Sequence, residues 1–149
     1  AEGVIAGYAL QDLRVSVHDG KHHPVDSKEV AFVTAGRRAF IDAVRKARPV
    51  VLEPIVSVQV IVPPERIGEV TGDLAGRRGR IDGSDVQGDG ATAVHALVPL
   101  SELDGYQIHL NAITGGAGIY TLDYSHYEPV PPRVQADLAA AHRPRDVDE

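Results

Sequence analysis

Apolar residues recur at two different spacings along this chain, and the spacing changes across residues 48–55. Before that stretch, apolar residues follow one another at steps of three and four, the pattern of one helix face. They are Val33, Gly36, Phe40, Val44 and Ala47. After it, apolar and polar residues alternate from Val56 to Val62, the pattern of a strand. Pro49 and Pro54 keep the backbone between the two patterns extended, so we predict a boundary between two structural units there.

The first unit, residues 1–53, begins with a short alternating segment. Apolar and polar residues alternate over 13–17, which predicts a half-buried strand. Asp19-Gly20 follows as a strong turn signal, and residues 21–24 are a polar loop. The helix of this unit is therefore expected to begin after that loop.

A capping pattern marks the start of this helix. Asp26 or Ser27 is the expected cap, and Glu29 follows Asp26 by three residues, as in a capping box. The helix is expected to end at Arg48, before a proline. One strand and one helix cannot bury both faces of a sheet. We therefore expect this unit to be incomplete, with further strands preceding Ala1.

The second unit, residues 54–128, alternates between strand and helix patterns. In chain order we expect a strand over 55–62, a helix from Pro63-Pro64 to Gly76, a strand over 80–86, a turn over 87–90, a strand over 91–100, a helix capped by Ser101 and ended by Gly115-Gly116, and a strand over 119–127. The expected inward residues of the helices are Ile67, Val70 and Leu74, then Leu103, Ile108, Leu110 and Ile113. This βαββαβ order predicts an α+β fold, a ferredoxin-like sandwich whose antiparallel sheet carries both helices on one face.

Charge is unevenly distributed between the two units, and this limits how the chain can bind nucleic acid. Residues 1–53 carry 8 Lys/Arg and 7 Asp/Glu, whereas residues 54–128 carry 4 and 10. A bulk electrostatic grip on nucleic acid is excluded for the second unit, so any RNA contact must come from local basic patches. The chain has no cysteine and no apolar run near the ~20 residues that span a bilayer. Residues 129–149 form the expected tail, with a short helix over 133–141 and disorder from Arg143 onward.

Histidines and arginines supply the candidate chemistry. His18, His22 and His23 are metal-ligand types, but Lys21 beside them makes a solvated loop the better interpretation, and we expect no metal. As an RNA-contacting tip, Lys21, His22 and His23 can instead reach phosphates or stack on bases. A second basic group closes the first helix of the second unit: Arg77, Arg78 and Arg80. These arginines either complement the helix dipole or bind phosphate.

Two further groups have competing interpretations. Four tyrosines of the second unit are either a base-stacking platform or, where they point inward, core residues: Tyr106, Tyr120, Tyr124 and Tyr127. Three aspartates of the expected hairpin have no calcium-loop spacing, which favours a solvated edge: Asp82, Asp85 and Asp89. No group of residues forms a recognisable catalytic constellation, so no catalytic residue is assigned.

A series of short segments, spread in order over nearly the whole chain, resembles the end of elongation factor G. They are Gly7-Tyr8, Asp19-Gly20, Val25-Asp26-Ser27, Ala31-Phe32, Ala39-Phe40, Leu52-Glu53-Pro54-Ile55, Gly72-Asp73-Leu74, Arg77-Arg78-Gly79-Arg80-Ile81, Val98-Pro99-Leu100, Gly105-Tyr106 and Ser125-His126-Tyr127-Glu128. No single segment is specific, but their order and spacing are. The resemblance implies that residues 1–53 are a partial domain four, an α/β unit of the ribosomal-protein-S5-like type. Residues 54–128 are then a ferredoxin-like domain five.

The resemblance also implies a function in translation. The family's GTPase moves tRNA and mRNA through the ribosome, its fourth domain entering the decoding region and its fifth lying against large-subunit rRNA. The phosphate-loop pattern G-x-x-x-x-G-K-[S/T] does not occur here. We therefore expect no enzyme activity and no cofactor in this chain, with GTP and Mg²⁺ held by a preceding domain of a cytoplasmic parent protein. The expected partners are the ribosome and its RNA, with no DNA and no membrane.

Residue by residue, the match is incomplete. His23 falls on the family's tip-loop histidine, but His22 replaces the usual aromatic residue and Pro24 the usual acid. Arg77, Arg78 and Arg80 fall on the family's basic cluster, whereas residues 111–118 lack the arginines usual there. These departures favour a divergent paralogue over the housekeeping factor. The alternative from another class is a stand-alone ferredoxin-like regulatory module that binds a small ligand or a second copy of itself.

Overall fold

The computed structural model describes residues 3–24 and 28–142. By their internal contacts, residues 52–129 form one compact unit, and residues 1–51 together with 130–149 form another. Each unit is described by itself. The capping pattern predicted at Asp26 and Ser27 and the tail predicted from Arg143 onward lie outside the described residues.

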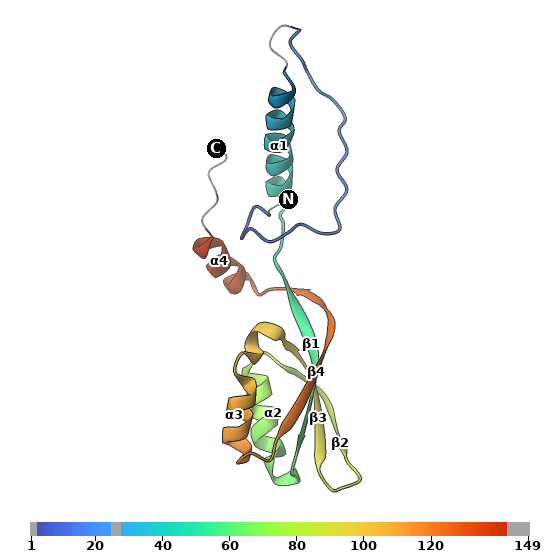
Figure 1. Ribbon diagram of the computed structural model, residues 1–149, viewed down its shortest axis with the longest axis vertical. Coiled ribbons are helices and arrows are strands. Elements are labelled where there is room, and N and C mark those ends of the chain that lie inside the picture. Colours follow the sequence, from blue (N-terminus) through green and yellow to red (C-terminus); the bar gives the residue numbers. More distant parts are fainter. Residues whose placement is uncertain (1–2, 25–27, 143–149) are drawn as a thin grey trace. The chain divides into compact units, whose positions relative to one another are not determined.

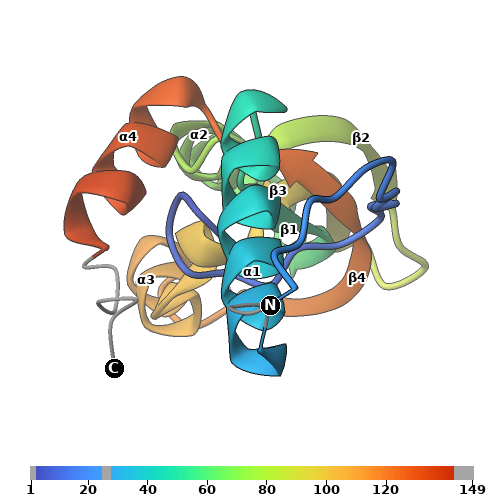
Figure 2. The same cartoon turned by 90° about the horizontal axis from the view of Figure 1, so that it is seen from above.

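Unit 52–129 is built on one antiparallel sheet. Its strands are β1 (Leu52–Val62), β2 (Arg80–Val86), β3 (Thr92–Pro99) and β4 (Ile119–Pro129), in the spatial order β2-β3-β1-β4. A 3₁₀ turn, η1 (Pro64–Arg66), leads into α2 (Ile67–Gly76), and a second, η2 (Leu100–Leu103), precedes α3 (Tyr106–Thr114). Both views place α2 and α3 on the same side of the sheet (Figures 1 and 2). The βαββαβ order and the antiparallel pairing confirm the predicted ferredoxin-like sandwich.

The core lies between the sheet and these two helices. Alternate residues of β1 point into it, and Val58, Val60 and Val62 are completely buried. Val70 and Leu74 of α2 face them and are also completely buried, as predicted from the helical stripe. Burying one such side chain contributes about 1.5–3 kcal/mol, so this layer supplies much of the unit's stability.

The second helix of this unit differs from the prediction in its start. Ser101 lies in η2 and makes no side-chain cap, because Gly105 adopts a left-handed φ of +64° and α3 begins only at Tyr106. The left-handed residue resets the helical phase. Ile108, predicted to point inward, is therefore 78% exposed, and Tyr106 is buried instead. Leu103 and Leu110 are buried, as predicted.

The other unit departs most from the prediction at its first segment. Residues 13–17 form no strand, and Val17 is 87% exposed. A strand requires a partner for its backbone N–H and C=O groups, and within residues 3–24 and 28–142 no strand pairs with this segment. The alternation of apolar residues alone was therefore insufficient evidence for a strand.

Helix α1 (Glu29–Lys46) carries the predicted apolar stripe, but none of its residues is buried. Val33 remains 65% exposed. The helix ends two residues before the predicted Arg48, which takes a left-handed φ of +53° directly before Pro49. The proline disfavours the helical conformation for the residue that precedes it, which explains the early end.

Helix α4 (Pro132–Ala141) occupies nearly the predicted range 133–141. Its Gln135 side chain accepts a hydrogen bond from the backbone N–H of Val51 at 2.9 Å, and the N–H of Val130 donates to the Val51 carbonyl at 2.9 Å. These two bonds satisfy both backbone groups of a buried residue. Of the helices in the described ranges, none is both long enough and apolar enough to cross a bilayer.

Candidate nucleic-acid interface

The three candidate arginines of unit 52–129 lie at the connection between α2 and β2. Helix α2 ends at Gly76, and the N–H of Gly79 donates to the carbonyl of Leu74 at 2.8 Å. Arg78 lies between them with a left-handed φ of +59°. A side chain at Gly79 would run into the Leu74 carbonyl oxygen, so this position requires glycine. The connection is a Schellman-type helix end in which arginine occupies the left-handed position that glycine usually takes.

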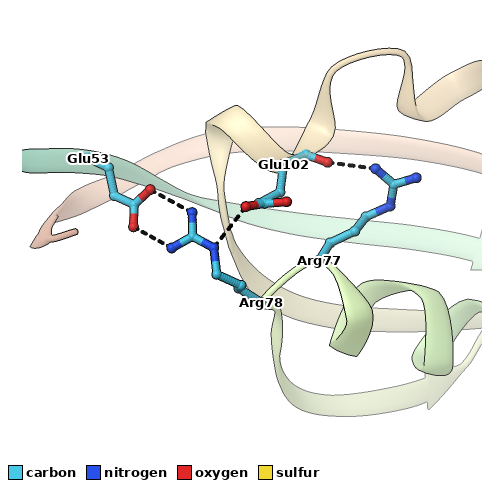
Figure 3. A network of polar contacts seen from close by, with 4 residues as sticks. All are labelled: Glu53, Arg77, Arg78 and Glu102. Carbon is cyan, nitrogen blue, oxygen red and sulfur yellow. Dashed lines mark hydrogen bonds and ion pairs between the residues drawn. The ribbon is translucent and has the colours of Figure 1, made fainter. Parts of the chain in front are cut away.

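Arg78 is held between two carboxylates (Figure 3). Its Nη1 and Nη2 atoms donate to the two carboxylate oxygens of Glu53 at 2.7 and 2.8 Å. Its Nε atom donates to Glu102 at 2.8 Å. The hydrogen bond to Glu53 raises the pKa of the Arg78 guanidinium further above its usual value, so the group stays charged. All three guanidinium nitrogens therefore already have carboxylate partners.

Arg77 is also engaged within the unit. Its Nη1 donates to the backbone carbonyl of Glu102 (Figure 3). Its Nε donates to the carboxylate of Asp73 at 3.0 Å. Its guanidinium lies 5.0 Å from the centre of the Tyr106 ring. The second carboxylate oxygen of Asp73 lies 2.9 Å from His109 Nε2. This set of contacts ties α2 to η2 and α3.

Arg80 is the least engaged of the three arginines. Its side chain is 63% exposed, and the carboxylate of Glu128 lies 4.0 Å away. His126 Nε2 lies 2.7 Å from a carboxylate oxygen of Glu128, within hydrogen-bond distance. This hydrogen bond is the main cause that lowers the pKa of Glu128. Ser125 Oγ lies 2.8 Å from the other ring nitrogen of His126. Arg80 therefore presents a charged, largely solvated guanidinium at the start of β2.

Lys21, His22 and His23, the predicted tip-loop residues, are exposed and belong to the other unit. They follow the predicted turn, in which the N–H of Gly20 donates to the side chain of Asp19 at 2.7 Å. In the described part of the chain, no three His, Asp or Glu side chains gather as a metal ion would require. A shallow depression on α1 is lined by residues of that one helix and its start, without enclosing walls.

Sequence reasoning found the three arginines but not their partners. Glu53 and Glu102 lie 25 and 24 residues from Arg78 along the chain, and no local pattern links them. The one available signal was an acidic residue at the head of the first strand. Of the four tyrosines, Tyr106 is a core residue, as expected for one that points inward. It is buried, and its ring lies edge-on to that of Tyr120 with ring centres 5.0 Å apart. Tyr124 and Tyr127 are exposed, with ring centres 5.7 Å apart.

Both parts of the chain match models of a known protein family. A family model described as elongation factor G, domain IV, matches residues 1–48, and one described as elongation factor G C-terminus matches residues 50–138. A crystal structure of a protein from Thermus thermophilus is similar to the chain, with 43% sequence identity and a TM-score of 0.75. That similarity covers 93% of this chain and 21% of the Thermus protein. The chain thus spans about a fifth of the length of that protein.

Proposed function

This chain belongs to the elongation factor G family, and we propose that it is the ribosome-contacting part of an elongation-factor-G-like translational GTPase. The observation that carries the proposal is the succession of the domain IV and C-terminal matches along one chain. Residues 1–53 are in this proposal a partial domain-four unit, 54–128 a domain-five unit and 129–149 a C-terminal tail. The parent protein is a divergent paralogue that acts in the cytoplasm.

In this proposal the chain supplies contact and positioning rather than chemistry. GTP and Mg²⁺ bind elsewhere in the parent protein, where a phosphate loop can hold them. Hydrolysis there moves these rear domains against ribosomal RNA. The lack of the phosphate-loop pattern among these 149 residues supports this division of labour.

Two groups of basic and aromatic-ring residues form the surfaces that face RNA. Lys21, His22 and His23 reach RNA of the decoding region, and their exposure supports this assignment. Arg77, Arg78 and Arg80 form the basic end of unit 52–129 that lies against large-subunit rRNA. Because that unit is acidic as a whole, a local cluster is the only way it can approach phosphates.

The test is ribosome association of the full-length parent protein over a salt titration. The logarithm of the binding constant falls linearly with the logarithm of the salt concentration. Replacing one phosphate-contacting cation makes this slope less steep by about 0.7–0.9. We expect this decrease for Arg80→Gln. The matched control is Arg66→Gln, because the Arg66 side chain is 41% exposed but pairs with Glu69 three residues further along the chain. An Arg80→Gln slope equal to that of the control would refute the rRNA contact.

A further inference from the structure

We propose that Arg78 is a positioning residue: it clamps the α2–β2 connection to the start of β1 and to η2, and thereby fixes where Arg80 presents its guanidinium to RNA. This role rests on the proposed RNA contact of Arg80. Of the three arginines of the basic cluster, Arg80 then touches phosphate and Arg78 acts through Arg80. Four observations on the residues around the clamp lead to this division.

The backbone of Arg78 is the first observation. A left-handed conformation strains a residue with a Cβ, and glycine at the same position would avoid this strain. Arginine therefore occupies a position for which its backbone is poorly suited. Such strain persists where the surrounding contacts over-determine the conformation. The contacts here come from the side chain, which indicates that the side chain is what the position requires.

The geometry of the clamp is the second observation. Two parallel N–H···O bonds to Glu53 and one to Glu102 join three segments of the chain at one guanidinium (Figure 3). A fork of this kind specifies direction as well as distance. Lysine cannot reproduce it, because an ammonium is a point charge without a planar donor set.

Local charge is the third observation. Arg78 carries one positive charge, whereas Glu53 and Glu102 together carry two negative ones within hydrogen-bond distance. Glu53 is only 9% exposed, and a buried carboxylate left without its cation is strongly disfavoured. A phosphate would have to displace one of these carboxylates and would meet the repulsion of the other. Arg78 is therefore poorly suited to bind phosphate itself.

The place of Arg80 is the fourth observation. It follows the clamp by two residues and opens β2, paired with Leu97 of β3. Leu97 in turn pairs with Ser57 of β1, while the neighbouring pair Val58 and Ala96 faces the core. Because side chains alternate along a strand, Arg80 projects from the face of the sheet that the helices leave open. The clamp thus sets the point at which this exposed strand begins.

The experiment is a double-variant cycle in the full-length parent protein, with ribosome affinity at fixed salt as the readout. We expect Arg80→Gln and Arg78→Lys each to weaken binding about tenfold, since each abolishes the same charged contact. The double variant is expected to bind no more weakly than Arg80→Gln alone, because Arg78 acts only through Arg80. Arg78→Lys keeps the charge and the strained backbone, so it isolates the loss of the fork.

Three outcomes would overturn the proposal. Losses that multiply in the double variant would mean that Arg78 binds phosphate by itself. Wild-type affinity in Arg78→Lys would mean that only its charge matters. An unaffected Arg80→Gln variant would remove the contact on which the role rests, and it would refute the proposed function at the same time. If Arg78→Lys does not fold, Glu102→Gln replaces it, since it weakens one arm of the clamp and leaves the two hydrogen bonds between Arg78 and Glu53 in place.

Discussion

The carboxylate of Glu53 and the guanidinium of Arg78 form two parallel hydrogen bonds, of 2.7 and 2.8 Å, across 25 residues of sequence. Glu53 lies in the first strand of unit 52–129, one residue after its start, and Arg78 lies in the connection after its first helix. The pair therefore joins the start of β1 to the end of α2. Substitutions in and around it should change the stability of the fold.

Removing the acidic partner should destabilise the fold. We expect Glu53→Ala to lower the free energy of unfolding of the chain by about 2 kcal/mol, because it leaves Arg78 with one carboxylate and a partly buried donor pair. Urea denaturation measures the change. The control is Glu65→Ala, an exposed carboxylate in η1, for which we expect a change within about 0.5 kcal/mol. Equal effects of the two substitutions would show that the pair contributes nothing to stability.

A methyl group at Gly79 should also destabilise the unit. Its Cβ would overlap the Leu74 carbonyl oxygen that accepts the Gly79 N–H, so the helix end would have to open. We expect Gly79→Ala to lower the free energy of unfolding by about 1–3 kcal/mol. Gly88→Ala is the matched control, because a Cβ at that hairpin glycine meets nothing within 4 Å. A Gly79→Ala protein as stable as this control would contradict the observed helix end.

Tyr106 should titrate above the usual pH range of a tyrosine. Burial is the main cause that raises its pKa to about 12, and the nearby Asp73 carboxylate adds to the increase. Absorbance titration of wild type against Tyr106→Phe should show that the variant lacks a late component. Because the folded-state pKa is raised, this tyrosine stabilises the fold below its unfolded pKa of about 10, and that contribution is lost as the pH rises toward 12. A variant titration curve with the same late component would assign it to another tyrosine.

Glu128 should titrate at a lower pH while His126 is present. The hydrogen bond from His126 is the largest cause that lowers the pKa of this carboxyl. The contribution of the Glu128 carboxylate to stability is present above its pKa in the unfolded state. It is lost as the pH falls through its pKa in the folded state. NMR titration of the Glu128 carboxyl carbon should show an increased pKa in His126→Gln. His95→Gln is the control, since His95 pairs with Asp85 on other strands. An unchanged Glu128 pKa in His126→Gln would exclude this hydrogen bond in solution.

Elements bounded by local signals were predictable from the sequence. β2 has the predicted bounds, 80–86, because Gly79 precedes it and the turn over 87–90 follows. In that turn the N–H of Gly90 donates to the Gln87 carbonyl at 3.0 Å. The inward face of α2 was predictable for the same reason, since helical spacing determines which residues share a side. The start of α3 was not, because Gly105 and Ser101 both offer plausible helix starts.

The candidate site was predictable only in part. Its basic residues could be read from the chain, but their environments could not. Arg77, Arg78 and Arg80 are neighbours in sequence and look alike there, yet the first two are bound to carboxylates and the third is largely solvated. The engagement of Arg78 depends on acids that lie about 25 residues away.

By itself, the sequence determined the order of the elements and the ferredoxin-like class of residues 54–128, and it showed the likeness to elongation factor G. The order and the fold class follow from periodicity and turn residues, which are properties of neighbouring positions. The likeness rests on short segments that match the family in order along the chain. The tertiary structure decided that residues 13–17 form no strand and that Arg78 is clamped while Arg80 is exposed. Both outcomes depend on hydrogen-bond partners from distant segments. A strand without a partner strand cannot form, and an arginine between two carboxylates is no longer an open cation.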